Sequence, residues 1–325
     1  VIANDNVNLT VRKGEILSIL GENGSGKTTL MNMLSGIYFP DEGEVYVDGK
    51  EVTIRSPKDS FALGIGMIHQ HFKLINILTA AENIILGLPG KEKLNMKQVE
   101  KEIRELTEQY GFDLNPSQKI YDMSVSQKQT VEIVKVLYRG ADILILDEPT
   151  AVLTPQETEK LFAVLRNMRK AGKSIIIITH KLNEVLELSD RVAVLRKGKY
   201  IDTVETAKAT VESLTEMMVG EKVKLDINRT EPVGAEKRIE MRGITCKNKE
   251  GLKVLTEASF TAYSGEILGV AGISGSGQKE LLESVAGLQP IESGEILYFS
   301  PEGTTEKISE MKAEDIKNLG ITLSF

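Results

Sequence analysis

An apolar run followed by a glycine-rich loop decides the fold of this chain: Ile16-Leu17-Ser18-Ile19-Leu20-Gly21-Glu22-Asn23-Gly24-Ser25-Gly26-Lys27-Thr28-Thr29. The loop fits the pattern G-x-x-x-x-G-K-[ST], and a segment of helical character that ends at Gly36 follows it. Strand, loop and helix in this order predict a phosphate-binding P-loop. Glycines let backbone N–H groups converge on a phosphate, and the helix N-terminus adds the positive end of its dipole. We therefore expect residues 21–29 to bind nucleotide phosphates.

Charged and hydroxyl groups complete the chemistry of this loop. A lysine at the position of Lys27 reaches the β- and γ-phosphates, and the Thr28 hydroxyl binds Mg²⁺. A second apolar run, Ile143–Leu146, leads directly into Asp147 and Glu148. After a P-loop, this order predicts that Asp147 holds Mg²⁺ and that Glu148 orients and deprotonates the attacking water. Without the P-loop, two adjacent carboxylates at a strand end would more simply face solvent.

Two further polar residues follow apolar runs. His180 comes after Ile175–Ile178, so we expect it at the carboxyl ends of the strands, where ligands bind in open α/β sheets. There it is a candidate catalytic contact to a γ-phosphate. Gln70 follows another short apolar run, and a lone glutamine has no functional meaning by itself. Its neighbours His69 and His71 are interpreted as surface residues.

The chain contains an internal repeat. Gly21 recurs as Gly272 and Gly43 recurs as Gly294, a shift of 251 residues in both cases. A period this long is not that of a solenoid and indicates two tandem domains, the second one truncated. We expect the first domain at 1–220, a polar linker at 221–237 and the second copy at 238–325. Both ends of the chain look like cuts through a longer protein.

The repeated loop departs from the P-loop pattern. Gln278 stands in the place of Lys27, and Lys279 in the place of Thr28. Gln278 has no charge for a γ-phosphate, and Lys279 removes the hydroxyl that would bind Mg²⁺. Backbone N–H groups can still hold a nucleotide there, but we expect hydrolysis at the second loop to be strongly impaired.

Composition and patterning indicate an α/β protein. The chain has 325 residues, of which 41% are hydrophobic and 27% charged, as in globular proteins. Amphipathic spacing predicts a helix from Met96 to Tyr110 that Gly111 closes, and a capping box from Thr154 to Glu157 starts another. Strands buried on both faces of a parallel sheet are predicted by three unbroken apolar runs: Ile16–Leu20, Ile143–Leu146 and Ile175–Ile178.

Charge and cysteine content narrow the class of protein. The net charge of −7 disfavours a nucleic-acid partner, because such proteins are usually basic. No run approaches the ~20 apolar residues that span a bilayer, so a membrane role would need a partner that crosses the membrane. A single cysteine, Cys246, fits a reducing compartment.

Taken together, the motifs resemble the ATP-binding-cassette family: P-loop, Gln70, a helical insertion at about 75–139, a signature, Asp147 with Glu148, then His180. The family's signature is L-S-G-G-Q, and both of its glycines are replaced here, in Met123-Ser124-Val125-Ser126-Gln127. The resemblance implies that this helix start presents Ser124, Ser126 and Gln127 to a phosphate held by another domain. Without the family, helix capping alone would account for Ser124.

Two more positions differ from the family pattern. Its S-A-L-D segment reads Ala151-Val152-Leu153-Thr154 here, which keeps the helix cap and loses the carboxylate. The resemblance therefore does not support contacts of that aspartate across a dimer. The family also stacks an aromatic residue on adenine, and no aromatic residue precedes Tyr38. We expect that residue to lie before Val1.

The resemblance implies an ATPase with ATP and Mg²⁺ as its cofactors. Lys27 and Mg²⁺ would offset phosphate charge, while Thr28, Gln70 and Asp147 would hold the metal and Glu148 would activate water. Each site would combine the P-loop of one cassette with the signature of the other. A full-length protein would then have one hydrolytic and one degenerate site, whereas the chain from 1 to 325 would lack a complete one.

Tandem cassettes with these departures look like the ATPases of sugar and nucleoside importers. The segments 138–157 and 69–72 look closest to the nucleoside branch, whose receptors are basic-membrane-protein-type lipoproteins. The resemblance implies a peripheral protein at the cytoplasmic face of the membrane, an integral-membrane permease, a second cassette or copy, an extracytoplasmic binding protein and no nucleic acid. Two alternatives stay open: a soluble cassette ATPase of translation or DNA repair, and a fragment that binds nucleotide without turnover.

Overall fold

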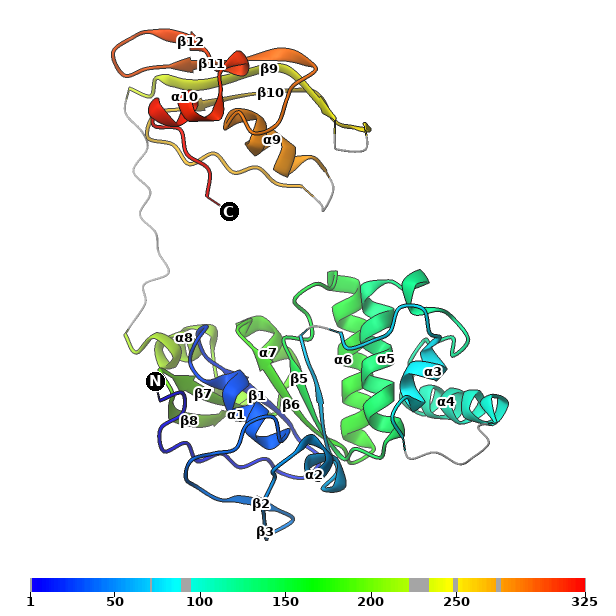
Figure 1. Cartoon of the computed structure of the whole chain (residues 1–325). Coiled ribbons are helices and arrows are strands. Elements are labelled where there is room, and N and C mark those ends of the chain that lie inside the picture. The colour runs from blue at the N-terminus through cyan, green and yellow to red at the C-terminus, as the bar shows by residue number, and fades with distance from the viewer. Residues whose placement is uncertain are drawn as a thin grey trace. The chain divides into compact units, whose positions relative to one another are not determined.

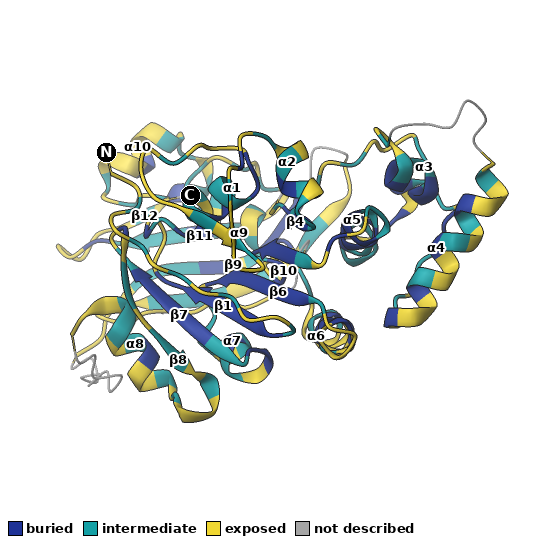
Figure 2. Ribbon diagram, turned by 90° about the horizontal axis from the view of Figure 1, so that it is seen from below, coloured by how far each residue is buried: buried dark blue, intermediate teal, exposed yellow. Residues whose placement is uncertain are grey.

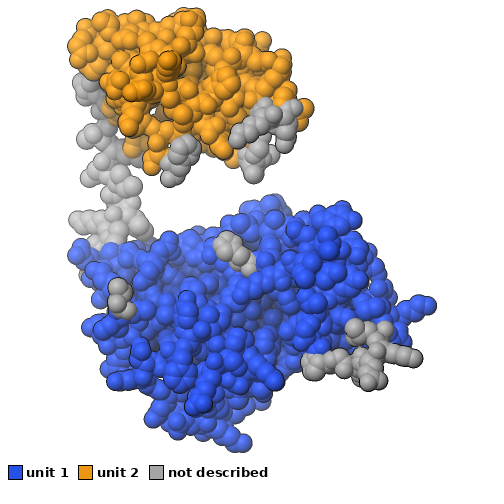
Figure 3. Space-filling model, in the orientation of Figure 1, with its two compact units in different colours: residues 1–225 blue, residues 226–325 orange. Residues whose placement is uncertain are grey.

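The computed structural model describes residues 2–70, 72–88, 95–221, 234–247, 251–272 and 276–324. The chain divides into two compact units, residues 1–225 and residues 226–325 (Figure 3). Parts of the segments discussed above lie outside the described residues. They include Val1, His71, residues 89–94 of the expected helical insertion, residues 222–233 of the expected linker and positions 273–275 of the second loop. No described helix has both the length and the apolar character needed to cross a membrane.

A six-stranded sheet forms the centre of the first unit (Figure 1). In spatial order its strands are β4 (Ile65–Ile68), β5 (Ile143–Asp147), β6 (Ser174–Thr179), β1 (Ile16–Leu20), β7 (Arg191–Arg196) and β8 (Lys199–Glu205). The first five are parallel, and β8 returns antiparallel to β7. Every residue of β1 and β6 is buried, as Figure 2 shows in dark blue. The predicted parallel, doubly covered sheet is confirmed.

Alternate residues of the central strands face two separate layers of helices. Ile19, Ile176 and Ile178 share a core with Met31 of helix α1. Ile16 and Ile177 belong to the core on the opposite side of the sheet, with helices α5 and α6. The helices that flank the sheet are α1 (Lys27–Leu34), α2 (Pro57–Ala62), α6 (Pro155–Lys170), α7 (Leu182–Leu188) and α8 (Val211–Val219). A 3₁₀ turn, η2 (Thr206–Lys208), and a small hairpin, β2 (Val45–Val47) with β3 (Lys50–Val52), complete this part.

A helical insertion lies at the side of the sheet where β4 and β5 are found (Figure 1). It contains α3 (Ala80–Ile85), α4 (Met96–Tyr110), the 3₁₀ turn η1 (Ile120–Asp122) and α5 (Val125–Tyr138). Its own core includes Ile84, Ile103 and Val131, all fully buried. The predicted helix from Met96 is confirmed, and Gly111 ends it in the left-handed conformation at φ 83°.

The second unit is a four-stranded antiparallel sheet with two helices. In spatial order the strands are β10 (Lys253–Tyr263), β9 (Lys237–Lys247), β11 (Ser293–Phe299) and β12 (Thr305–Lys307). The helices are α9 (Gln278–Val285) and α10 (Ala313–Asn318), with a 3₁₀ turn, η3 (Ile308–Glu310). Cys246 is fully buried in the core of this unit, and burial raises the pKa of its thiol. Helix α9 has the bounds of α1 shifted by 251, which places the sequence repeat in the structure.

Candidate nucleotide-binding site

The glycine-rich loop connects β1 to α1 and leaves the start of α1 open. Gly26 is the N-cap in the left-handed conformation, at φ 95°, and no side chain caps the helix. Its first turn contains no acidic residue, and the first N–H groups of any helix lack partners within the helix. A Cβ on Gly26 would lie 2.5 Å from the Ala3 carbonyl oxygen, so a side chain is excluded here. The loop is therefore a cradle with free N–H groups and a positive dipole, which suits an anion.

The amine of Lys27 lies back on the loop. Its Nζ donates to the carbonyl oxygens of Gly21, at 2.7 Å, and Glu22, at 2.8 Å. Burial lowers the pKa of Lys27, while Glu148, Asp147 and Glu22 act in the opposite direction. The remaining partner of Lys27 Nζ is the Ser25 hydroxyl, at 3.5 Å. A buried ammonium group whose hydrogen-bond partners are all uncharged retains a strong affinity for phosphate charge.

Asp147 and Thr28 bring two oxygen atoms together beside the loop. The Thr28 hydroxyl donates to Asp147 Oδ2 at 3.3 Å, across 119 positions of sequence. Burial raises the pKa of Asp147, although the Thr28 hydroxyl and Lys27 act against the shift. A hydroxyl and a carboxylate oxygen side by side are the kind of hard oxygen donors that Mg²⁺ prefers. The residues present thus fit the expected metal.

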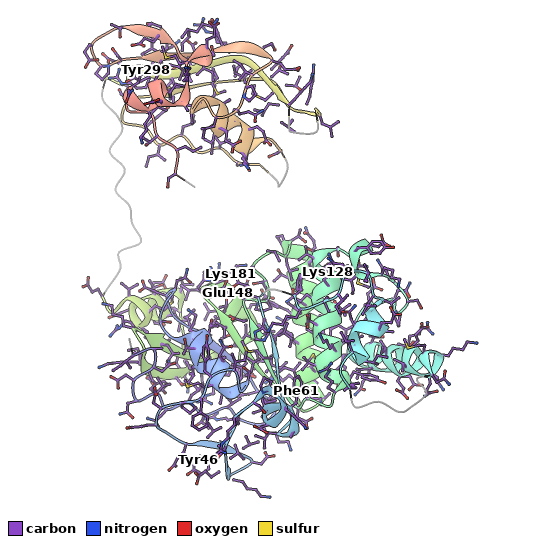
Figure 4. The ribbon with its side chains drawn as sticks, viewed as in Figure 1. Tyr46, Phe61, Lys128, Glu148, Lys181 and Tyr298 are labelled. Carbon is purple, nitrogen blue, oxygen red and sulfur yellow. The ribbon has the colours of Figure 1, made fainter. Side chains whose placement is uncertain are left out.

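Glu148 and His180 meet at the carboxyl ends of β5 and β6. His180 Nδ1 lies 2.9 Å from Glu148 Oε1. The backbone explains the contact, because Glu148 N–H donates to Ile178 O at 2.9 Å and ties the end of β5 to β6. Glu148 has a positive φ of 46°, which is uncommon outside glycine and is typical of functional positions. Figure 4 shows Glu148 beside Lys181 at this end of the sheet.

Gln70 is exposed two residues beyond the end of β4, next to β5 in the sheet. It is therefore at the same edge as Asp147, although the structure shows no direct contact between the two. His69 differs from the surface position expected for it: it is partly buried, and burial, with Lys73, lowers its pKa.

Comparison with known proteins agrees with this geometry. A family model described as ABC transporter matches residues 4–151. The chain is 46% identical to the nucleoside import ATP-binding protein NupA of Lactococcus lactis subsp. cremoris, over 97% of this chain and 63% of that protein. It is 44% identical to the guanosine import ATP-binding protein NupO of Bacillus subtilis, over 100% of this chain and 66% of that protein. A solved ATP-binding cassette of an ABC transporter in its ADP conformation superposes with a TM-score of 0.58, at 28% identity, over 68% of this chain and 90% of that chain.

The chain belongs to the ATP-binding-cassette family. It spans somewhat less than two thirds of the length of the two curated relatives. The resemblance identified from the motifs is therefore confirmed at the level of the family and of its P-loop α/β fold.

The signature segment of the cassette forms a complete helix cap. Gln127 N–H donates to Ser124 Oγ at 3.3 Å, and Ser124 N–H donates to Gln127 Oε1 at 2.9 Å. The Ser126 and Ser124 hydroxyl oxygens are 3.1 Å apart. The structure thus shows the capping role of Ser124, and all three side chains lie at the exposed or half-exposed start of α5.

Sequence reasoning missed the residues that brace the edge of the sheet where Glu148 and His180 lie. Lys181 Nζ donates to Thr150 O at 3.0 Å, and Thr150 Oγ1 donates to Glu184 Oε2 at 2.6 Å, so α7 holds the turn after Glu148. Lys181 directly follows His180 in the sequence, but no sequence pattern predicts its contact with Thr150. A hydroxyl of Ser126 also contributes most to lowering the pKa of Glu157, which links the signature to the start of α6.

The second loop of the cassette chain has a different environment. Gln278 Nε2 donates to Val270 O at 3.0 Å, and Lys279 pairs with Glu283 at 3.7 Å along its own helix. Glu280 places a carboxylate in the first turn of α9, where α1 has none. An acid there opposes an anionic ligand, and sequence comparison of Thr29 with Glu280 could have identified this difference.

Proposed function

We propose that the chain is the ATP-binding and ATP-hydrolysing part of an importer for a nucleoside or simple sugar. One observation carries the proposal: the structure brings the Lys27 amine, the Thr28–Asp147 oxygen pair and the Glu148–His180 pair to a single edge of one sheet. These groups come from positions far apart in the sequence, and together they have the parts that phosphoryl transfer to water needs.

Each residue has a separate task in this reaction. The loop residues 21–29 and Lys27 bind and orient the phosphates of ATP, while Thr28, Asp147 and Gln70 hold Mg²⁺. When bound, Mg²⁺ offsets the charge on the β- and γ-phosphate oxygens. Glu148 Oε orients the attacking water and accepts its proton. His180, which contacts that carboxylate at 2.9 Å, positions Glu148 and steadies the γ-phosphate.

The repeat extends this proposal to the organisation of the protein. Residues 1–220 are the first cassette, with the helical subdomain at about 75–139, and residues 238–325 are the start of a second one. Each site combines one P-loop with the other cassette's signature, so Ser124, Ser126 and Gln127 contact the phosphates of a partner domain. The loop at Gln278 is the degenerate member of the pair.

The transported compound and the partners are inferred from the named relatives. One is described as a nucleoside import protein and another as a guanosine import protein, while a third, from Haloferax volcanii, is described as a glucose import protein. We propose that the chain is a peripheral protein at the cytoplasmic face of the membrane. Its proposed partners are an integral-membrane permease, a second cassette or copy and, indirectly, an extracytoplasmic binding protein.

Binding and turnover of Mg·ATP by this chain, measured beside Lys27→Ala, test the proposal. We expect tight binding that Lys27→Ala abolishes, with little turnover, because the P-loop site lacks a partner signature. Turnover that depends on Lys27 would mean that Ser124 serves the first site, as in a homodimer, and would overturn the split-site organisation. Absence of binding by the unmodified chain would overturn the nucleotide site itself. Co-purification with a membrane permease separates an importer from a soluble cassette ATPase.

A further inference from the structure

The segment that follows Gln70 is held by the helical insertion rather than by the sheet. The Lys73 N–H donates to Glu132 Oε1 at 2.7 Å, and Lys135 Nζ donates to Lys73 O at 3.2 Å. Glu132 and Lys135 lie on α5, 3.7 Å apart as an ion pair. Both polar groups of one backbone residue are thus bound by two opposite charges on the same helix, and charge-assisted hydrogen bonds are the stronger kind.

A second contact of the same type lies two residues further along. Ile75 N–H donates to Asn83 Oδ1 at 2.8 Å, and Asn83 Nδ2 donates back to Ile75 O at 3.1 Å. The same amide also donates to Thr79 O at 3.0 Å. Asn83 is 1% exposed, and its side-chain amide makes these three hydrogen bonds to the backbone. Lys73 and Ile75 are therefore bound to α5 and α3, respectively.

Burial of the Glu132 carboxylate, which accepts the hydrogen bond from Lys73 N–H, carries a free-energy cost. The residue is only 8% exposed, and an ionised carboxylate out of water is unfavourable unless hydrogen bonds and an opposite charge compensate it. Lys73 N–H and Lys135 supply that compensation. Packing of α5 alone would be satisfied by an apolar side chain at this position. The carboxylate is thus placed to hold the loop.

Helix α5 begins at the signature. Ser124 caps it, and Glu132 follows eight residues later, about 12 Å along the helix axis at 1.5 Å per residue. Lys73 is three residues from Gln70, so the chain between them spans at most about 10 Å. One helix therefore runs from the Ser124 cap to the contacts on Lys73, three residues after Gln70, which is proposed to hold Mg²⁺.

We propose that Glu132, supported by Lys135 and Asn83, is a positioning residue that ties Gln70 to the signature helix. Gln70 reaches the metal only while α5 holds Lys73. A partner that moves the signature helix then moves Gln70 with it. The inference rests on the proposed nucleotide site, and it names residues through which that site senses the position of the helical insertion.

A double-mutant cycle tests the proposal, with binding of Mg·ATP and of metal-free ATP to the chain as its measurement. We expect Glu132→Ala to weaken Mg·ATP binding roughly tenfold and metal-free ATP binding less than about twofold, because Gln70 has no Mg²⁺ to hold when the metal is absent. Glu132→Gln keeps an acceptor for Lys73 N–H and should lie between Glu132→Ala and the unmodified chain. If Glu132 acts through Gln70, the variant with both Glu132→Ala and Gln70→Ala binds no more weakly than Gln70→Ala alone.

Controls separate positioning from general stability. Glu105→Ala removes an exposed carboxylate of α4 that pairs with Lys101, and it should leave both affinities unchanged. Hydrogen exchange at the Lys73 and Ile75 amides should become roughly tenfold faster in Glu132→Ala. Additive losses in the cycle, or equal losses for Mg·ATP and metal-free ATP, would overturn the proposal. If Glu132→Ala does not fold, Glu132→Gln and Lys135→Met take its place in the cycle. A chain whose ATP binding does not depend on Lys27 would refute the nucleotide site instead.

Discussion

In the two copies of the repeat the turn and the helix have the same geometry, but the segments around them differ. Helices α1 and α9 occupy equivalent positions, and each begins after a left-handed glycine, at φ 95° for Gly26 and 84° for Gly277. In both, a Cβ on that glycine would lie 2.5 Å from a carbonyl oxygen, that of Ala3 in one copy and Val254 in the other. Ala3 and Val254 again differ by 251 in residue number, so the close approach of a carbonyl oxygen to the glycine is repeated in the second copy.

The segments that precede the two loops, in contrast, differ in structure. Strand β1 lies between β6 and β7, and all of its residues are buried. The equivalent positions 267–271 belong to none of the described strands, and Ile267 is 100% exposed. The comparison teaches that the turn and helix are set by local sequence, whereas the strand depends on neighbours supplied by distant segments.

Substitution of the matched isoleucines should show the largest difference between the copies. Ile16→Ala opens a cavity at a fully buried position and should lower the free energy of unfolding of the first unit by about 2–5 kcal/mol. Ile267→Ala removes a side chain that contacts nothing in the described structure and should change stability by less than about 0.5 kcal/mol. Denaturant unfolding followed for each unit measures both values. A large cost for Ile267→Ala would mean that the segment 267–271 is paired in solution and would remove the contrast.

Exchange of the residues that distinguish the two loops should have the next largest effect. Lys27→Gln gives the first loop the residue of the second, and it should weaken ATP binding about 100-fold because the charged contacts to phosphate are lost. The reverse substitution, Gln278→Lys, should leave nucleotide binding at the second loop as it is in the unmodified chain, since Glu280 still opposes an anion at the start of α9. Binding affinity and stoichiometry, each compared with the unmodified chain, check both substitutions. A nucleotide bound by Gln278→Lys in addition to those bound by the unmodified chain would show that this single residue, and not the surroundings, separates the copies.

The difference between local interactions and contacts of distant segments also explains which features the sequence could predict. The helix from Met96, the capping box at Thr154 and the buried runs of β1, β5 and β6 depend on periodicity and local hydrogen bonds, and the structure confirms them. Candidate residues at strand ends could likewise be named, because parallel strands end at one edge of a sheet.

Contacts between distant segments could not be predicted in this way. The strand order, the hydrogen bond of Lys73 to Glu132 and the bracing of Thr150 by Lys181 join segments through packing, which leaves no pattern in the local sequence. The positive φ of Glu148 could not be predicted either. The hydrogen bond from its N–H to Ile178 O, and not its residue type, accompanies that conformation.

Asp147→Asn should give the smallest and most specific effect, a gain in stability at the first site. Burial raises the pKa of Asp147, so the ionised carboxylate is less favourable in the folded chain than in the unfolded one. A group of this kind stabilises the fold below its unfolded pKa, and that contribution is lost as the pH rises through its folded pKa. At neutral pH an amide of the same shape avoids the penalty and should raise the free energy of unfolding by about 1 kcal/mol, while Mg²⁺-dependent ATP binding weakens.

The pH dependence provides the control for this prediction. The stability difference between Asp147→Asn and the unmodified chain should shrink as the pH falls toward the ordinary carboxyl range, because the carboxylate is then neutral as well. Asp48→Asn changes an exposed aspartate in a left-handed turn that asparagine also tolerates, and it should show no such trend. A higher free energy of unfolding for Asp147→Asn at neutral pH would mean that the first copy keeps its buried charges for ligand binding at the expense of stability. The second copy, with Gln278 in place of Lys27, avoids part of that cost. A loss of stability in Asp147→Asn at neutral pH would contradict this, because it would show that Lys27 and Thr28 more than compensate the buried carboxylate.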